Sequence, residues 1–519
     1  MKKLAYIILS VLLFLSCRKG KENKEDILNQ IEASYVEQYR PQFHFSPQEK
    51  WMNDPNGLVY NDGVYHLFYQ YYPGATVWGP MHWGHATSRD LVKWEHKPIA
   101  LFPDKKGFIF SGSAVVDNKN TSGFGIDGKV PLVAIYTYFR LDIEKKGGVN
   151  TQTQGIAYSL DNGNTWTKYA GNPVIDNTAL KDFRDPKVFW HNETESWIMA
   201  LVAGNHAKFY RSKDLKAWEY ISEFGRNVGA HGGVWECPDL FKLKVEGTEE
   251  EKWVLIISIG SGGPNGGSGT QYFVGDFDGK TFTTNQTEFK WLDWGTDNYA
   301  GVTYNNVPSE DRIFIGWMSN WQYALSTPTT TWRSAMTVPR KLRLKKYEDS
   351  YLLHNYPLET LNTLIEKSIS ESINIEPNQE KILNFNNLNQ AEIAFKTDSK
   401  DFNLKLANKE GGFVSIKFDP ISKLVIIDRT SSGKKDFQPE FGNKLHYMSI
   451  DELPNSIFEV RILMDQSSME LFINEGQYVM TEQLFPNKNY TEMFINNTNN
   501  SAILSLKDFS VAKVSSIWE

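Results

Sequence analysis

Short apolar and aromatic runs alternate with polar turn clusters along most of the chain after residue 40. The run Leu58-Val59-Tyr60 is followed by Asn61-Asp62-Gly63 and then by a second run, Val64 to Tyr69. An Asp-Gly pair between two such runs predicts a β-hairpin. Similar runs recur up to about residue 345, at 132–139, 187–190, 197–202, 253–259 and 313–318. Because helical periodicity is scarce, this pattern predicts an all-β fold.

A weak internal repeat indicates how these strands are grouped. In three copies a Ser-x-Asp triplet precedes a tryptophan: Asp90 before Trp94, Asp161 before Trp166 and Asp214 before Trp218. A degenerate fourth copy runs from Gly275 to Phe282. One such turn every 50–70 residues is typical of four-stranded blades, in which the aspartate caps its own turn. With the strands from 300 to 345, the repeat predicts a β-propeller of five blades, spanning residues 40–345.

The composition changes near residue 345, where a polar stretch begins and the aromatic repeat ends. We expect a linker at 346–364. From 365 to 519, period-2 runs between Gly, Asn and Asp turns, such as Gly412 to Ile416 and Met469 to Ile473, predict a second domain with a β-sandwich fold.

The N-terminus has the pattern of a targeting segment. A basic start is followed by an apolar run of 12 residues, Leu4 to Leu15, which is too short to span a bilayer. The run ends in Ser16-Cys17 and resembles a bacterial lipoprotein signal, in which Cys17 becomes the lipidated first residue. A plain secretory signal is the alternative. We therefore expect a signal at 1–17, a solvated tether at 18–39, and a lipid-anchored protein of the bacterial envelope.

Composition and charge narrow the classes of function. The chain has 55 Lys and Arg against 62 Asp and Glu, a net charge of −7, which argues against a nucleic-acid-binding protein. Aromatic residues make up 14% of the chain; they favour β-structure and supply faces that suit sugar rings, although most are expected in the core. If Cys17 is lipidated, Cys237 is the only thiol left, so no intramolecular disulfide can form.

Three motifs place an acidic residue near a proline at the start of an apolar strand. They are Trp51 to Gly57, Phe183 to Pro186 and Trp235 to Asp239. Each lies 29 to 40 residues before an Asp-turn copy, and therefore early in its blade. Because the innermost strands of a propeller converge on its central channel, Asp54, Asp185 and Glu236 are predicted to meet in one funnel.

Such a group of acids suits glycoside cleavage, in which two carboxylates flank the scissile bond. Apolar surroundings and nearby like charge raise the pKa of a catalytic acid. Arg184 is expected to keep its neighbour Asp185 ionised. From the residues alone, the alternative stays open that each acid is a buried group capping a strand turn.

The same motifs carry a family resemblance. WMNDPNG, FRDP and WECPD together resemble glycoside hydrolase family 32, which contains invertases, inulinases and levanases. The resemblance extends from about Arg40 to the C-terminus and includes four more blocks: 78–85, 110–113, 294–300 and 465–472. The family fold that it implies is a five-bladed propeller followed by a β-sandwich.

The resemblance also implies roles for individual residues. Asp54 matches the nucleophile that forms a fructosyl-enzyme intermediate, Glu236 the general acid and base, and Asp185 the stabiliser of the transition state. Residues expected to line the terminal-fructose pocket are Asn53, Gln70, Trp78, Ser113 and Arg184, with Trp51 and Trp317 as apolar walls. No metal or organic cofactor is implied, and His82 and His85 are expected to serve packing or hydrogen bonding rather than metal binding.

The sequence therefore predicts a retaining hydrolase that cleaves β-fructofuranosidic bonds in fructans such as levan and inulin, and possibly in sucrose. Its expected partners are the fructan and, through Cys17, a membrane; no nucleic acid is expected. Two alternatives stay open: a fructosyltransferase, and a catalytically inactive, lipid-anchored fructan-binding protein. The intact acidic trio favours an enzyme over the binding protein.

Overall fold

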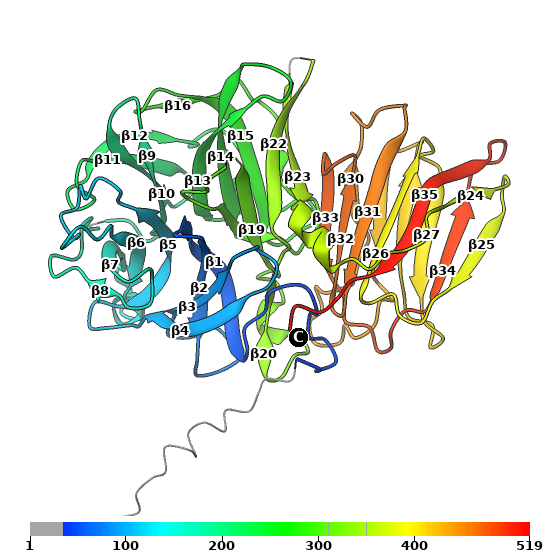
Figure 1. Ribbon diagram of the computed structural model, residues 1–519, viewed down its shortest axis with the longest axis horizontal. Coiled ribbons are helices and arrows are strands. Elements are labelled where there is room, and N and C mark those ends of the chain that lie inside the picture. The colour runs from blue at the N-terminus through cyan, green and yellow to red at the C-terminus, as the bar shows by residue number, and fades with distance from the viewer. Residues whose placement is uncertain (1–34, 178, 310, 349, 519) are drawn as a thin grey trace, which may run out of the picture.

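The chain forms two β-domains that lie side by side, a propeller followed by a sandwich (Figure 1). The computed structural model describes residues 35–177, 179–309, 311–348 and 350–518. Five sheets make up the propeller and two sheets the sandwich. The predicted all-β fold, with a five-bladed propeller and a C-terminal sandwich, is confirmed.

The first three blades are antiparallel sheets in chain order. Blade one contains β1(Lys50–Asn61), β2(Val64–Tyr72), β3(His82–Ser88) and β4(Glu95–Leu101). Blade two contains β5(Phe108–Val116), β6(Leu132–Phe139), β7(Gln152–Ser159) and β8(Thr167–Lys168), with the short helix α1(Leu141–Glu144) after β6. Blade three contains β9(Phe183–His191), β10(Ser196–Ala203), β11(Ala207–Ser212) and β12(Glu219–Phe224).

The last two blades carry short extra strands. Blade four contains β13(Trp235–Lys244), β14(Glu251–Ile259), β15(Gly269–Phe277), β16(Phe282–Thr283) and β17(Lys290–Trp291). Blade five contains β18(Tyr299–Thr303), β19(Arg312–Met318), β21(Ala335–Met336), β22(Arg340–Tyr347) and β23(Ser350–Pro357), with the 3₁₀ helix η1(Ala324–Ser326) after β19. The strand β20(Trp332–Arg333) leaves this blade and pairs with β1 in parallel, which ties blade five to blade one.

The turns that the sequence repeat marks connect the third and fourth strands of four blades. Oδ1 of Asp90, Asp161, Asp214 and Asp278 accepts backbone N–H groups of its own turn, at distances of 2.6 to 2.9 Å. The β1–β2 hairpin turns at Asp62-Gly63, with φ of 47° and 78°, as a two-residue turn of this type requires. The repeated aspartates are therefore structural, as predicted.

The sandwich packs two six-stranded sheets around one apolar core. One sheet contains β24(Glu371–Ile375), β35(Leu504–Lys513), β26(Ala391–Thr397), β31(Phe458–Asp465), β32(Ser468–Ile473) and β33(Tyr478–Gln483). The other contains β25(Glu380–Asn384), β34(Glu492–Asn497), β27(Phe402–Ala407), β28(Phe413–Asp419), β29(Leu424–Asp428) and β30(His446–Ser449). Alternate residues of most of these strands face the core, as the period-2 pattern predicts.

Two predicted boundaries differ from the structure. The expected linker at 346–364 contains β23, which pairs with β22 along its whole length and completes blade five. The chain then passes from the propeller to the sandwich through η2(Glu359–Leu364) and its flanks. Of the expected tether at 18–39, only Tyr35 to Tyr39 are among the described residues, and they pack on the fold: the ring of Tyr35 stacks on Trp518 with centroids 4.0 Å apart. Both stretches contain buried residues, Leu353 to Asn355 in the expected linker and Tyr39 in the expected tether, so neither is a break in the fold.

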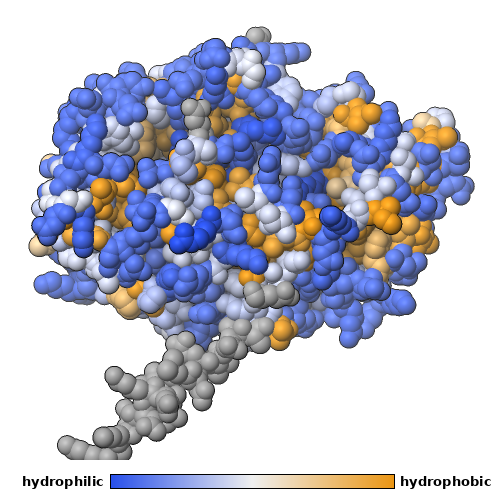
Figure 2. Space-filling view, viewed as in Figure 1, coloured by the Kyte–Doolittle hydropathy of each residue, from blue (hydrophilic) through white to orange (hydrophobic). Residues whose placement is uncertain are grey.

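The face of the molecule seen in Figure 2 is mostly hydrophilic, with small, scattered apolar areas. Within the described residues, no helix is long and apolar enough to cross a membrane. The predicted signal and Cys17 lie outside the described residues.

Candidate active site

A bulge interrupts the innermost strand of every blade at the same end of the central channel. In each blade two residues of the inner strand lie opposite one residue of the next strand, and these pairs are 53–54, 110–111, 185–186, 237–238 and 300–301. Bulges bend a strand and redirect its side chains, and they tolerate proline because no ladder N–H is needed there. Pro186 and Pro238 occupy two of them. Asp54, Ser111 and Asp185 lie within three of the bulges, and Glu236 and Tyr299 directly precede the other two, so the bulges gather these five side chains at one end of the channel.

Asp54, on β1, is held by two donors. Ser111 Oγ, from the bulge of β5, donates to Asp54 Oδ2 at 2.6 Å, and Asn53 Nδ2 donates to Oδ1 at 3.0 Å. Asn53 is itself fixed by Trp51 Nε1, which donates to its Oδ1 at 2.7 Å. Burial raises the pKa of Asp54, the negative charge of Glu236 adds to this, and the two hydrogen bonds oppose it.

Glu236, on β13, is fixed through both carboxylate oxygens. Arg184 Nη2 donates to its Oε1 at 3.0 Å, and the hydroxyl of Tyr299 donates to its Oε2. Tyr299 is fully buried on β18 and belongs to the fifth bulge region. The carboxyl group is thus clamped between blade three and blade five, with part of its surface open to the pocket.

Asp185, on β9, is buried and accepts the backbone N–H of Cys237 at 3.0 Å. Burial raises the pKa of Asp185 to about 7; the Arg184 guanidinium opposes this, while Glu236 and Asp54 add to it. Arg184 lowers the pKa of Asp185, which is the expected direction, but burial outweighs this effect. Arg184 points its Nη1 at Asp182, 2.6 Å away, and its Nη2 at Glu236, whereas its Nε lies 3.9 Å from Asp185.

The thiol of Cys237 shows how closely the acids approach one another. Its Sγ lies 3.6 Å from an oxygen of Asp54 and 3.6 Å from an oxygen of Asp185, and Cys237 follows Glu236 in the chain. The three acids predicted to meet in one funnel therefore do so, although they come from three blades.

The other predicted pocket residues lie around this centre. Gln70 is buried and donates to Asn56 and to the backbone of Ile109, which holds it in place. Trp78 is partly exposed and packs on Phe108, Phe110 and Phe139. Trp51 and Trp317 are fully buried. A third tryptophan, the partly exposed Trp321, packs against both, with ring centroids 6.0 Å from Trp51 and 4.8 Å from Trp317.

The prediction for Ser113 needs correction. Its hydroxyl donates to Pro186 O and accepts the N–H of Val188, both at 2.9 Å, so it joins blade two to blade three. Ser111, two residues earlier, is the serine that faces Asp54. Tyr299, Asp182 and Trp321 also belong to the site and were not among the predicted site residues. Ser111 and Tyr299 lie inside family-like blocks, at 110–113 and 294–300, so a signal for both was present.

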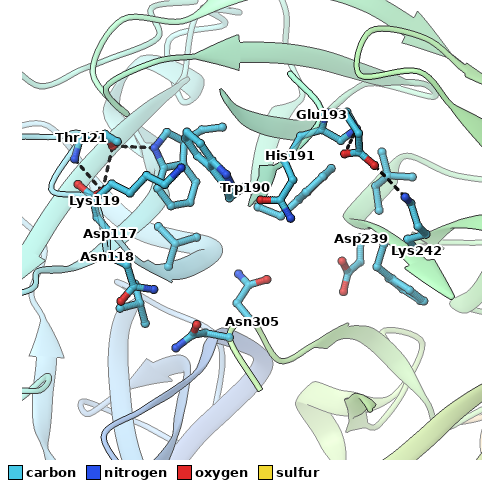
Figure 3. A pocket seen from close by; sticks show the side chains of 18 of the residues that line it. Asp117, Asn118, Lys119, Thr121, Trp190, His191, Glu193, Asp239, Lys242 and Asn305 are labelled. Atoms are coloured by element: carbon cyan, nitrogen blue, oxygen red, sulfur yellow. Dashed lines mark hydrogen bonds and ion pairs between the residues drawn. The ribbon is translucent and has the colours of Figure 1, made fainter. Parts of the chain in front are cut away.

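A cavity of about 520 Å³ opens away from the three acids, and several of its lining side chains are seen in Figure 3. Asp239 reaches it although it lies only three residues after Glu236; its carboxylate is 3.2 Å from Lys187 Nζ. Lys242 pairs with Glu193 at 3.0 Å on the same wall. None of the predicted catalytic or sugar-binding residues lines this cavity.

The described residues contain no group of three or more His, Cys, Asp or Glu side chains arranged to hold a metal ion. His82 Nδ1 lies 2.8 Å from Pro80 O, and His85 Nε2 lies 3.1 Å from His66 Nδ1. The two histidines therefore face different partners.

Comparison with known proteins identifies the class. Residues 44–357 match the family described as glycosyl hydrolases family 32 N-terminal domain, and residues 359–513 match the family 32 C-terminal domain. The chain therefore belongs to glycosyl hydrolase family 32 and is a glycoside hydrolase, as predicted.

Particular relatives share most of the chain. A levanase of Bacillus subtilis (strain 168) is 45% identical over 495 residues, which cover 93% of this chain and 72% of the levanase. The extracellular exo-inulinase inuE of Aspergillus niger (strain ATCC MYA-4892 / CBS 513.88 / FGSC A1513) is 42% identical over 488 residues, 87% of this chain and 90% of that protein. The crystal structure of exo-inulinase from Aspergillus awamori superposes with a TM-score of 0.86 at 38% identity, covering 93% of this chain and all of that one.

The two serines of the 110–113 block are expected to respond differently to substitution. Ser111→Ala removes the shorter hydrogen bond to Asp54 and should lower kcat/KM roughly 10-fold, with little change in Tm. Ser113→Ala removes two buried bonds between blades and should cost about 1–3 kcal/mol of stability. Steady-state kinetics and thermal melts on both variants check this; a larger kinetic loss in Ser113→Ala would contradict the assignment.

The raised pKa of Asp185 predicts a pH-dependent gain in stability on its removal. In the native state the carboxyl group keeps its proton up to about pH 7, but in the unfolded chain it loses it near pH 4, so native stability falls as pH rises between these values. Asp185→Asn abolishes this loss. Its Tm should exceed that of the wild type by roughly 2–4 °C at pH 8 and by much less at pH 5. A gain that does not depend on pH would contradict the burial argument.

Proposed function

We propose that this hydrolase cleaves β-fructofuranosidic bonds of fructans with retention of configuration, through a covalent fructosyl intermediate on Asp54. The observation that carries the proposal is the meeting of Asp54, Glu236 and Asp185 in one pocket, each held by its own hydrogen-bond donors. Two carboxylates at such a centre are what a retaining glycosidase uses.

In the first step, Asp54 Oδ attacks the anomeric carbon of the terminal fructosyl unit while Glu236 gives its proton to the glycosidic oxygen. The bond from that carbon to the leaving group breaks, and an ester to Asp54 forms. In the second step Glu236 takes a proton from water, whose oxygen attacks the same carbon and releases the Asp54 carboxylate. Tyr299 and Arg184 hold Glu236 in place for both steps.

Asp185 stabilises the transition state rather than bonding covalently to the sugar. It lies beside Asp54 across the Cys237 thiol, where its carboxyl oxygens can accept hydrogen bonds from sugar hydroxyls. Asn53, Gln70, Trp78 and Arg184 supply further polar and aromatic contacts around the fructosyl unit. Levanase and exo-inulinase, the names of the relatives above, support levan and inulin as substrates.

The dependence of the rate on the leaving group distinguishes the proposed acid, Glu236, from the proposed nucleophile, Asp54. Glu236→Ala should lower kcat on sucrose or inulin by about 10²–10⁴-fold, because acid catalysis is lost. On an aryl β-fructofuranoside, whose leaving group needs little protonation, the first step should recover in Glu236→Ala but not in Asp54→Ala. Rapid-mixing assays of phenolate release measure this step directly, and thermal melts confirm folding. Equal rates for both variants on the aryl substrate would overturn these roles.

We also propose that the protein is anchored to the bacterial envelope by lipid on Cys17, with the propeller and sandwich outside the bilayer. The proposal rests on the basic start, the 12-residue apolar run and the Ser16-Cys17 junction. A lipid anchor suits an enzyme that acts on a polymer at the cell boundary.

Replacing the lipidated cysteine should detach the enzyme from the membrane. Cys17→Ser should move the protein to the soluble fraction with unchanged specific activity, since stable anchoring depends on acyl chains. The chain has two cysteines, and Cys237→Ser is the matched control, which should stay in the membrane fraction. Fractionation with a high-salt wash is the measurement; retention of Cys17→Ser in the membrane would refute the lipid anchor.

A further inference from the structure

A cluster of buried charges joins the two domains beside the active site. It consists of Asp293, Asp297 and Arg340 from the propeller, and Arg429, Glu470 and Glu482 from the sandwich, and we refer to it as the charged seam. All six side chains are at most 1% exposed. Figure 1 shows β32 and β33, which carry Glu470 and Glu482, on the side of the sandwich that faces the propeller.

The segment 293–298, which leads into β18, is attached to the sandwich by backbone and side chain. Trp294 N donates to Val479 O at 2.8 Å, and Asp297 N donates to Thr481 O at 3.1 Å. The segment thereby covers the open edge of β33. Asp293 in turn accepts Thr481 N at 2.9 Å and Thr481 Oγ1 at 2.6 Å. The position of this segment is therefore set by the sandwich.

Arg429 is the centre of this attachment. Its Nη1 donates to Asp297 Oδ2 at 2.8 Å, and its Nη2 donates to Thr296 Oγ1 at 2.9 Å. The same Asp297 oxygen accepts the N–H of Gln483 at 2.9 Å. A planar guanidinium that contacts two adjacent residues fixes both their distance and their orientation.

Tyr299 follows Asp297 by two residues and donates to Glu236, so the seam lies at the base of the residue that holds this acid. Arg429 also reaches the tryptophan wall of the pocket. Its Nη2 donates to Tyr323 Oη at 3.1 Å, and that hydroxyl donates to Asp297 Oδ1 at 2.6 Å. Tyr323 lies two residues after Trp321, so one arginine fixes both segments.

Stability alone does not account for this arrangement. Taking charges out of water costs several kcal/mol per ion, and a buried ion pair often contributes no more than apolar residues of the same volume. The geometry of the seam, in contrast, is specific: Arg429 and Glu482 contact side chains of the segment before Tyr299, and Asp293 and Asp297 belong to that segment.

We propose that Arg429, in the C-terminal sandwich, is a positioning residue for catalysis, which acts through Asp297 and Tyr299 on Glu236. The sandwich then contributes to catalysis by positioning an active-site residue, and it is not only an accessory domain. This inference rests on the proposed role of Glu236 as the acid, and the experiment below separates the two.

The test compares Arg429→Lys, which keeps the charge but loses the planar fork, with Arg461→Lys as the matched control. Arg461 is also buried in the sandwich and pairs with Glu392 at 2.5 Å, away from the seam. On sucrose, Arg429→Lys should lower kcat about 10-fold with a smaller change in KM, and on an aryl β-fructofuranoside less than about 3-fold. Arg461→Lys should lower Tm without changing either rate.

A double-mutant cycle shows whether the effect passes through Tyr299. Tyr299→Phe removes the hydrogen bond to Glu236, so adding Arg429→Lys to it should cost little more, whereas independent effects would multiply. If Arg429→Lys does not fold, Asp297→Asn tests the same chain of contacts, because it weakens the bond between Arg429 and the segment before Tyr299. Multiplying effects, or an unchanged kcat in a folded Arg429 or Asp297 variant, would overturn the inference.

The outcome for Glu236→Ala distinguishes the two failures. If Glu236→Ala is no more impaired on sucrose than on the aryl substrate, the acid assignment itself fails. If Glu236→Ala behaves as proposed and Arg429→Lys shows no leaving-group dependence, only the positioning role of Arg429 fails.

Discussion

The rest of this structure depends on one constraint: the carboxyl groups of Asp54, Asp185 and Glu236 lie close together in a largely buried site, where their negative charges repel one another. Burial raises the pKa values of Asp54 and Asp185, so bringing them together opposes folding at neutral pH. One arginine, Arg184, faces this group, and it is shared with Asp182. The remaining compensation comes from neutral donors: Ser111, Tyr299 and the backbone of Cys237. Each donor comes from a different blade or bulge, so the site exists only when the propeller closes.

Closure is secured at two places outside the pocket. The strand β20 pairs with β1, which joins the last blade to the first. The charged seam holds the segment before β18 against the sandwich, and with it the blade-five contribution to the pocket. A propeller with loose blades would let like charges move apart, which lowers their energy and misplaces the acid. Rigid support is therefore a chemical requirement here, because a shift of about 1 Å can cost roughly 100-fold in rate.

The sequence predicted the fold well because local chemistry and tertiary structure agree in it. Asp90, Asp161 and Asp214 cap their own turns, so each is recognisable without knowledge of its neighbours. The acids were found for a similar reason, since each stands beside a distinctive tryptophan or arginine. The errors concern properties that depend on distance between blades. Ser111 and Ser113 differ only in their position relative to a bulge, and this position decides which of them faces Asp54. Arg184 pairs with Asp182 and Glu236 rather than closely with its neighbour Asp185, and this choice of partner cannot be read from the sequence. The strand β23 was assigned to the linker because the turn before it, from Lys345 to Ser350, is as polar and charged as a linker.

The five bulges explain why chemistry occurs at one end of the channel and not at the other. Along β13, Glu236 lies before the bulge and reaches the pocket, whereas Asp239 lies after it, pairs with Lys187 and accepts the N–H of Thr303. Along β9, Asp185 lies within the bulge and Lys187 after it. A regular strand would send residues three apart to opposite faces. The bulge adds a bend to that alternation, so that β13 carries a partly exposed acid, Glu236, on one side of the bulge and the buried ion pair of Asp239 with Lys187 on the other.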